Sequence, residues 1–211
     1  MMRFAFVIVG LGVALGVNAQ TYPSKPIRFV SPYPPGGAND ILARIIGQKL
    51  GESLGQQIVI ENRGGATGNI GAEYVAKAPP DGYTILMGQA SNLTINVSLM
   101  KMPYDPVKDL APVTLVATTP NLLVVHPSFP VRTVKDLVAL AKAKPGSINY
   151  ASSGSGSAGH LAGELFKRVA HIEMVHIPYK GAAPALTDVV AGQAQLYFTS
   201  PISATPFVKG G

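Results

Sequence analysis

The chain has 211 residues, of which 47% are hydrophobic and 13% charged, a composition typical of an ordered globular protein with one large or two small domains. It contains no cysteine, which excludes disulfides, thiolate metal sites and cysteine nucleophiles. The net charge of +6 favours acidic ligands, but the basic residues are scattered and tryptophan is absent, so we expect no nucleic-acid partner.

The first 19 residues follow the plan of a secretory signal peptide. Arg3 precedes an uncharged apolar run from Phe4 to Val17, and a small-residue ending follows at Ala19. The apolar run is short for a membrane span. We therefore expect export, cleavage after Ala19 and no stable membrane insertion after cleavage, with a retained membrane helix as the alternative.

Short runs rich in valine and isoleucine alternate with amphipathic segments in the first half of the chain. The predicted strands are 27–31, 58–61, 83–87 and 113–117, and the predicted helices are 39–53 and 67–78. In the first helix, Asn39 or Asp40 is placed to cap the start, and Gly51 and Gly55 are placed to end it.

A second series of elements follows a pause in the pattern at residues 118–121. Its predicted strands are 122–126, 148–151, 174–177 and 195–198, and its predicted helices are 133–143, 157–169 and 184–191. Alternation of strand and helix implies parallel sheets with helices on their faces. We therefore expect two α/β lobes, residues 20–119 and 120–211, joined by a hinge near residue 120.

Glycine, serine, threonine and asparagine gather directly after the predicted strands. The loops concerned are 31–40, 62–71, 88–92, 152–160 and 178–185. In an open parallel sheet the ligand crevice lies beyond the carboxyl ends of the strands. Three of these loops run straight into helices, whose free N–H groups favour anions, so we expect a carboxylate or phosphate site. The alternative for any single loop is that glycine merely permits a tight turn.

The glycines of one loop imitate a dinucleotide-binding motif. Gly154, Gly156 and Gly159 satisfy the pattern G-x-G-x-x-G, and Glu173 lies roughly twenty residues further on. Glu173, however, precedes a predicted strand, whereas the ribose-binding acid belongs at a strand end. We therefore expect no cofactor.

Catalytic and metal-binding patterns are also missing from the sequence. There is no G-x-S-x-G motif, and the four histidines lack a plausible metal-ligand set. Asp40 and Asp188 have no partner carboxylate nearby in sequence, so paired acid-base chemistry is not indicated. His160, in the first turn of a helix, can donate to a ligand carboxylate, with a structural role as the alternative. His171 is expected at the surface and His176 in a strand.

Four longer motifs are specific in combination. They are YPSKPIRFVSPYPPGGANDILAR (22–44), VIENRGGATGNIGAEYVAKAPPDGYTILMG (59–88), SSGSGSAGHLAGELF (152–166) and HIPYKGAAPALTDVVAGQ (176–193). Through them the chain resembles the Bug-type extracytoplasmic solute receptors of tripartite tricarboxylate transporters. The resemblance covers nearly the whole chain after residue 19.

This resemblance implies a periplasmic, non-catalytic, monomeric receptor with the two-lobed α/β fold of type II periplasmic binding proteins. Such a receptor closes over a small organic acid, often a dicarboxylate, tricarboxylate, amino acid or aromatic acid, and presents it to membrane transporter subunits. Segments matching 33–40 and 66–69 hold one carboxylate in these receptors, and the stretch matching 153–160 approaches from the other lobe. The candidate ligand-binding residues are Tyr33, Pro34, Gly36, Gly37, Asn39, Asp40, Ala66, Thr67, Gly68, Asn69, Gln89, Ser91, Ser153, Ser155, Gly156, Ser157, His160 and Thr199.

The chain departs from the family pattern in two places. Gln195 and Thr199 stand where relatives commonly have aspartates, which favours a plain acid over an amino acid if Thr199 faces the pocket. The chain also stops at residue 211, where relatives continue with a strand that returns to the first lobe, so we expect a C-terminally truncated fold. An exported α/β enzyme or a ligand sensor acting on a carboxylated small molecule is the alternative function.

Overall fold

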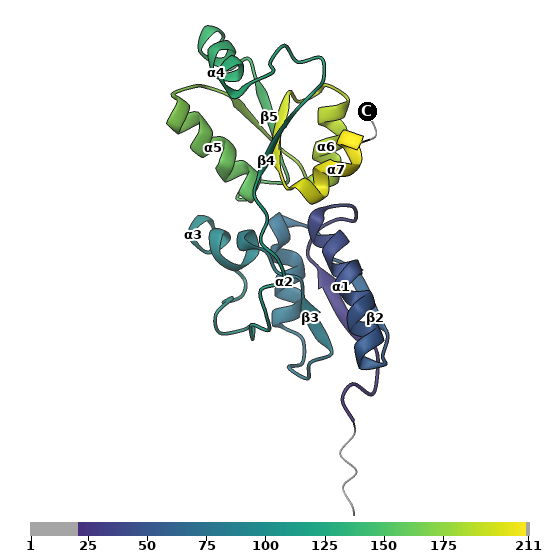
Figure 1. Cartoon of the computed structure of the whole chain (residues 1–211). Coiled ribbons are helices and arrows are strands. Elements are labelled where there is room, and N and C mark those ends of the chain that lie inside the picture. The colour runs from purple at the N-terminus through teal and green to yellow at the C-terminus, as the bar shows by residue number, and fades with distance from the viewer. Residues whose placement is uncertain (1–20, 210–211) are drawn as a thin grey trace, which may run out of the picture.

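The structure is a computed structural model that describes residues 21–209, and it forms two layered lobes, one above the other (Figure 1). We call the elements from β1 to α3 the first lobe and those from β4 to α7 the second lobe. The predicted signal peptide lies outside the described residues.

The first lobe is built on a fully parallel sheet with the strand order β2-β1-β3. Its strands are β1 (Ile27–Ser31), β2 (Ile58–Asn62) and β3 (Thr84–Leu86). Its helices are α1 (Ala38–Leu54), the 3-10 turn η1 (Ala66–Gly68), α2 (Asn69–Ala76), the π-helical turn η2 (Ser91–Ile95) and α3 (Asn96–Leu99). The central strand β1 is the most buried, and Phe29 packs there against Ala43 of α1 and Met87.

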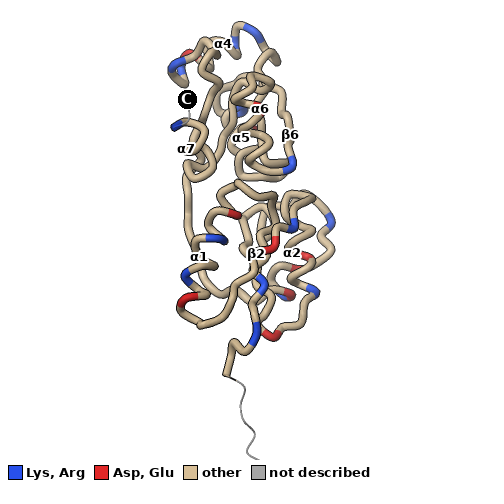
Figure 2. Tube along the Cα trace, turned by 90° about the vertical axis from the view of Figure 1, so that its right-hand side faces the viewer, with Lys and Arg blue, Asp and Glu red and all other residues tan. Residues whose placement is uncertain are grey.

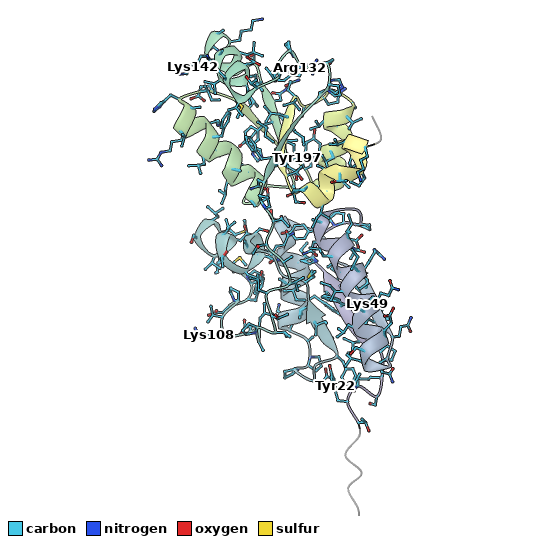
Figure 3. All side chains as sticks on the ribbon, viewed as in Figure 1. Tyr22, Lys49, Lys108, Arg132, Lys142 and Tyr197 are labelled. Atoms are coloured by element: carbon cyan, nitrogen blue, oxygen red, sulfur yellow. The ribbon has the colours of Figure 1, made fainter. Side chains whose placement is uncertain are left out.

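The second lobe is built on a mixed sheet with the order β4-β7-β5-β6. Its strands are β4 (Leu122–Val125), β5 (Asn149–Ser152), β6 (Val175–Pro178) and β7 (Leu196–Thr199). Its helices are α4 (Val134–Ala143), α5 (Ala158–Ala170), α6 (Ala182–Val190) and α7 (Pro201–Lys209). Tyr150 and Leu196 are fully buried in its core, and Tyr197 lies inside the same lobe while Lys142 projects outward (Figure 3).

Two sequence predictions about the sheets were wrong. β4 runs antiparallel to β7, because it enters the sheet from the connection between the lobes and not from a crossover helix. Residues 113–117 form no strand, and Val113 and Leu115 are 88% and 79% exposed. None of the described strands pairs with this run, so its backbone groups have no ladder partner. The sequence analysis also did not predict η2, α3 or α7.

The expected caps of α1 were only partly right. Gly37 is the N-cap residue, and neither Asn39 nor Asp40 caps the helix from that position. Gly51 lies inside the helix, whereas Gly55 ends it with a φ of 64°, a left-handed conformation that glycine adopts without strain. The second lobe uses side-chain caps instead, from Thr133 on α4 and Ser157 on α5.

Candidate functional site

The glycine-rich loops of the two lobes meet each other across the junction between the lobes. The Thr67 hydroxyl donates to the Ser155 carbonyl at 2.8 Å, which joins the loop after β2 to the loop after β5. The Ala38 N–H, at the start of α1, donates to the Ser203 hydroxyl of α7 at 3.0 Å. The predicted loops therefore converge, and Ser203 joins them although no sequence motif marked it.

A left-handed turn at η1 presents the start of α2 to this junction. Gly65, Ala66, Thr67 and Gly68 all have positive φ, at 130°, 47°, 52° and 92°. Two consecutive non-glycine residues in this region are a sign of local strain that the surroundings must hold in place.

Three buried side chains hold the η1 turn. The Tyr33 hydroxyl donates to the Thr67 carbonyl at 3.1 Å and also forms a hydrogen bond with Ser91. Burial raises the pKa of Tyr33 to about 12, so its hydroxyl stays protonated and remains a donor. Asn92 donates to the Gly68 carbonyl at 3.3 Å and accepts from the Gln89 N–H at 2.9 Å. The sequence analysis missed Asn92, although it follows the predicted site residue Ser91 directly.

Asn39 and Asp40 are engaged inside the first lobe. Asn39 accepts from the Ser31 hydroxyl at 2.8 Å and donates to the Met87 carbonyl at 2.7 Å. Asp40 accepts from the Gly36 N–H at 3.0 Å and from the Asn62 amide at 2.8 Å, and it also pairs with Arg44. These contacts order the loop that leads into α1.

The electrostatics of Asp40 follow from those partners. Burial opposes ionisation of this carboxyl, but the hydrogen bonds from Arg44, the Gly36 N–H and Asn62 outweigh that cost and lower its pKa. Asp40 is therefore ionised at neutral pH, and both of its oxygens already accept hydrogen bonds.

The two walls of the junction approach closely at glycines. A Cβ added to Gly181 would lie 3.0 Å from Pro34, and one added to Gly37 would lie 3.7 Å from Ala182. A Cβ added to Gly156 would lie 2.7 Å from the Asn96 carbonyl oxygen, Oδ1. Glycine at 156 is therefore required for the second lobe to come this close to the first.

Asn96 carries an unusual atom at this contact. Its amide donates to Asn69 Oδ1 at 2.8 Å, while its own Oδ1 is, among the side chains of residues 21–209, the buried polar atom without a hydrogen-bond partner. The loop at Gly156 covers that oxygen. Burying an unsatisfied acceptor costs about 1–3 kcal/mol, so this contact opposes the approach of the two lobes.

The second-lobe wall is the loop between β5 and α5. Ser157 caps α5 by accepting from the His160 N–H at 3.3 Å, and the Gly156 N–H donates to His160 Nδ1 at 3.1 Å. Thr199 is buried at the end of β7.

Gln195 lies at the opposite end of β7, where its side chain accepts from the Asn149 N–H at 2.8 Å. It therefore closes a strand end away from the junction. His171 is exposed and ends α5, as expected.

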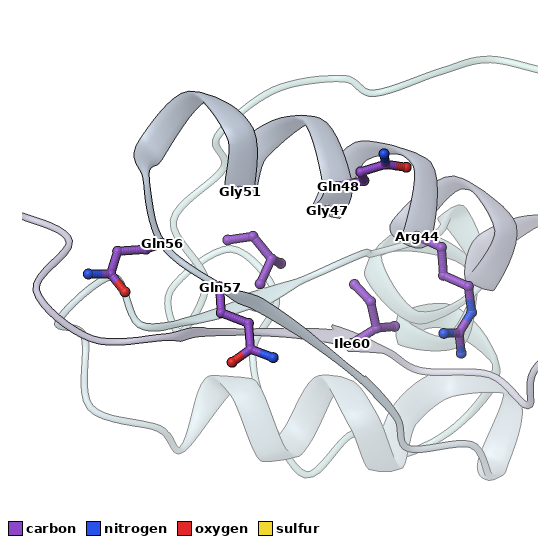
Figure 4. Close-up of a pocket in the computed structure, with 8 residues that line it drawn as sticks. Arg44, Gly47, Gln48, Gly51, Gln56, Gln57 and Ile60 are labelled. Atoms are coloured by element: carbon purple, nitrogen blue, oxygen red, sulfur yellow. The ribbon is translucent and has the colours of Figure 1, made fainter.

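One surface hollow lies away from the junction between the lobes. It lies beside α1 and β2, as Figure 4 shows. Its lining residues are Arg44, Gly47, Gln48, Gly51, Gln56, Gln57, Ile58 and Ile60. A Cβ added to Gly47 would lie 2.8 Å from the Ile60 side chain, so the hollow results from close packing of a glycine face of α1 on β2. None of its lining residues belongs to the loops at the lobe junction. Arg44 on α1 is linked to that junction only through its ion pair with Asp40.

In the described part of the chain, charged and metal-binding groups mark no second site. Lysines and arginines are spread over both lobes (Figure 2). Within residues 21–209, no cluster of three or more His, Asp or Glu side chains is arranged to hold a metal ion. In the same part of the chain no helix has the length and apolar character needed to cross a bilayer.

A family model described as tripartite tricarboxylate transporter family receptor matches residues 42–211 of the chain. The chain belongs to this receptor family. Membership confirms the family resemblance that the sequence motifs predicted, and the matching family is one of receptors and not of enzymes. Among relatives, BugT of Bordetella pertussis is 41% identical over 187 residues, which cover 88% of this chain and 57% of BugT. A UPF0065 protein of Pseudomonas sp. (strain P51) is 40% identical over 203 residues, which cover 93% of this chain and 60% of that protein.

Solved structures of receptors are also similar. R. palustris Rpa4515 with adipate gives a TM-score of 0.86 at 41% identity, over 90% of this chain and 64% of that one. MatC from Rhodopseudomonas palustris with bound malate gives 0.83 at 32% identity, over 90% of this chain and 65% of that one. These similarities confirm the predicted two-lobed α/β fold. The chain spans less than two thirds of the length of each protein named here.

Proposed function

We propose that the chain binds a small organic acid, such as a dicarboxylate or tricarboxylate, between its two lobes and presents it to the membrane subunits of a tripartite tricarboxylate-type transporter. The observation that carries this proposal is the convergence of strand-end loops from both lobes, joined by the Thr67–Ser155 hydrogen bond. The adipate and malate in similar receptor structures support a carboxylate as the ligand class.

The predicted site residues divide into two roles in this proposal. The first role is to offer donors to the ligand carboxylate, from the loop 33–40, from the turn before α2 and from the loop 153–157. The Gly36 and Gly156 N–H groups are not among these donors, because they already donate to Asp40 and His160. The second role is to hold those donors in place, and the engaged side chains of Tyr33, Asn39 and Asp40 belong to it. Because His160 Nδ1 accepts from Gly156, the neutral ring carries its proton on Nε2, which is then available as a donor.

Ligand preference, location and assembly complete the proposal. We propose a plain acid in preference to an amino acid, since Thr199 supplies no carboxylate for an ammonium group. The lobes divide near residue 120, and the chain acts as a monomer. It is exported to the periplasm with cleavage near Ala19, in line with similar structures described as a periplasmic transporter and a periplasmic binding protein.

A thermal-shift screen tests the function. The chain, alone and extended with the C-terminal residues of a relative, is heated with adipate, malate, citrate, succinate, aspartate and glutamate. A ligand that binds only the native state raises the melting temperature through mass action. A rise with one or more plain acids supports the proposal, and no rise with any acid in either version contradicts it. Conversion of the added acid to a product, followed by NMR, would favour the enzyme alternative.

A further inference from the structure

A stacked column of aromatic rings lies beneath the loop between β5 and α5, which we call the β5–α5 loop (residues 152–157). The His176 ring, on β6, stacks on Tyr150 with centroids 4.9 Å apart and on His160 with centroids 4.1 Å apart. The three rings come from β5, β6 and α5, so only the folded second lobe brings them together.

Both histidines hold the backbone of this loop. His176 Nε2 lies 2.7 Å from the Ser152 hydroxyl, which lies 3.1 Å from the Gly154 carbonyl and accepts from the Gly154 N–H at 3.1 Å. The hydroxyl has one proton, which goes either to the Gly154 carbonyl or to His176 Nε2, so the tautomer of His176 decides which atom donates in this contact. His160 Nδ1 accepts from the Gly156 N–H at 3.1 Å.

We propose that His160 and His176 are positioning residues for the β5–α5 loop, and that they hold its ligand-binding conformation only while both rings are uncharged. This inference rests on the proposed function, because it concerns the second-lobe wall of the same site. The receptor should therefore bind its ligand more weakly at acidic pH.

The reason lies in what a second ring proton does. A proton on Nδ1 of His160 would point at the Gly156 N–H, so two donors would face each other and the loop would have to move. Two stacked imidazolium rings would repel each other as well.

The other titratable groups around the rings do not cancel this effect. Glu164 on α5 is close enough to interact with the charge of both histidines, and it favours a charged His176, which Lys167 opposes. The Glu164 carboxylate, however, already pairs with Lys167 at 2.9 Å. The Tyr150 hydroxyl donates to Glu164, and Tyr197 on β7 lies against Gly159, so neither tyrosine offers His160 a counter-charge. From the first lobe, the groups nearest Gly156 are Asn96 and Leu99, and neither titrates.

The pKa of His176 has the matching sign. Burial, followed by the neighbouring His160, lowers the pKa of His176 from 6.5 to about 4. A histidine whose pKa is depressed by folding contributes stability above its unfolded value, and this contribution is lost as the pH falls towards the folded value. Acid therefore works against the folded column and the loop above it.

The test compares affinity at several pH values in wild type and in His160→Asn. Asparagine places an acceptor oxygen close to where Nδ1 lies, so it keeps the Gly156 contact but does not titrate. The probe is adipate or malate, measured by calorimetry between about pH 7.5 and about pH 4, a range that reaches the pKa of about 4 of His176. Ionisation of the acid itself affects both proteins equally, so the difference between them is the readout.

We expect wild type to lose about tenfold more affinity than His160→Asn over this range. The variant also lacks the Nε2 donor and binds more weakly at pH 7.5, so each protein is compared with its own affinity at that pH. His176→Phe should keep the stack but lose the Ser152 contact and bind weakly at every pH, and His176→Gln should restore binding. Equal pH profiles for wild type and His160→Asn would overturn the proposal, as would normal binding by His176→Phe.

A readout without ligand separates this inference from the proposed function. NMR of the imidazole nitrogens in the whole chain should show His160 with its proton on Nε2 and with an unprotonated Nδ1 that accepts from the Gly156 N–H. A proton on Nδ1 at neutral pH would overturn the histidine proposal even if the acid binds. Failure of adipate and malate to bind, with the expected tautomer present, would count against the proposed ligand class alone.

Discussion

Replacing Thr67 by valine tests whether the hydrogen bond between the lobes contributes to ligand binding. Valine has nearly the same shape as threonine and the same branching at Cβ, so the left-handed turn at φ 52° changes little. The substitution removes the donor to the Ser155 carbonyl, at 2.8 Å in the structure.

The expected cost follows from the exposure of this contact. A hydrogen bond that water can replace contributes about 0.5–1.5 kcal/mol net, which corresponds to roughly twofold to twelvefold in a dissociation constant. The contact joins the lobes, so we expect the loss to appear in affinity for the bound acid. We expect the melting temperature of the unliganded protein to stay within about 1 °C of wild type.

Calorimetric titration of wild type, Thr67→Val and Thr67→Ser with the acid found in the thermal-shift screen measures the effect. Serine keeps the hydroxyl and serves as the matched control. If Thr67→Val binds as tightly as wild type, or if it loses stability without ligand to the same extent as affinity, the hydrogen bond does not couple closure to binding and the argument is wrong.

Three further predictions concern local structure. Thr133→Ala removes the capping box of α4 and should lower the free energy of unfolding by about 1 kcal/mol in urea, with ligand affinity unchanged. Gly163→Ala places a Cβ against the buried Tyr150 ring and should cost about 1–3 kcal/mol, measured the same way, whereas Gly55→Asn at the exposed end of α1 should cost less. The lowered pKa of Asp40 predicts a stabilising contribution that is present above the unfolded value of about 3.9 and lost as the pH falls through the folded value. Acid unfolding of Asp40→Asn should lack that component, and an acid-unfolding slope identical to wild type would contradict the role assigned to this carboxylate.

Much of the fold follows from short-range interactions that a sequence displays directly. The strand 27–31 and the helix near 39–53 were predicted within a few residues, because apolar periodicity and terminal glycines act within one element. The glycine-rich loops were predicted at strand ends for the same reason. Their convergence was an expectation from sheet topology, and the Thr67–Ser155 contact shows two of these loops meeting.

Other features depend on contacts between distant segments. The antiparallel direction of β4 depends on how the chain enters the second sheet, and residues 113–117 have strand-like residues without a strand beside them. The sequence also gave no sign that Asn96 would face Gly156 or that Ser203 would bind the start of α1, since these pairs are 60 and 165 residues apart.

By itself, the sequence determined the α/β class, the positions of most elements and the anion-favouring loops, because these follow from residue type and spacing along the chain. The tertiary structure alone decided which side chains serve those loops. His176 illustrates the difference, because it was expected only as a strand residue, yet it lies between Tyr150 and His160 and reaches Ser152. A side chain's role in a site depends on neighbours brought by folding, and local pattern carries no record of them.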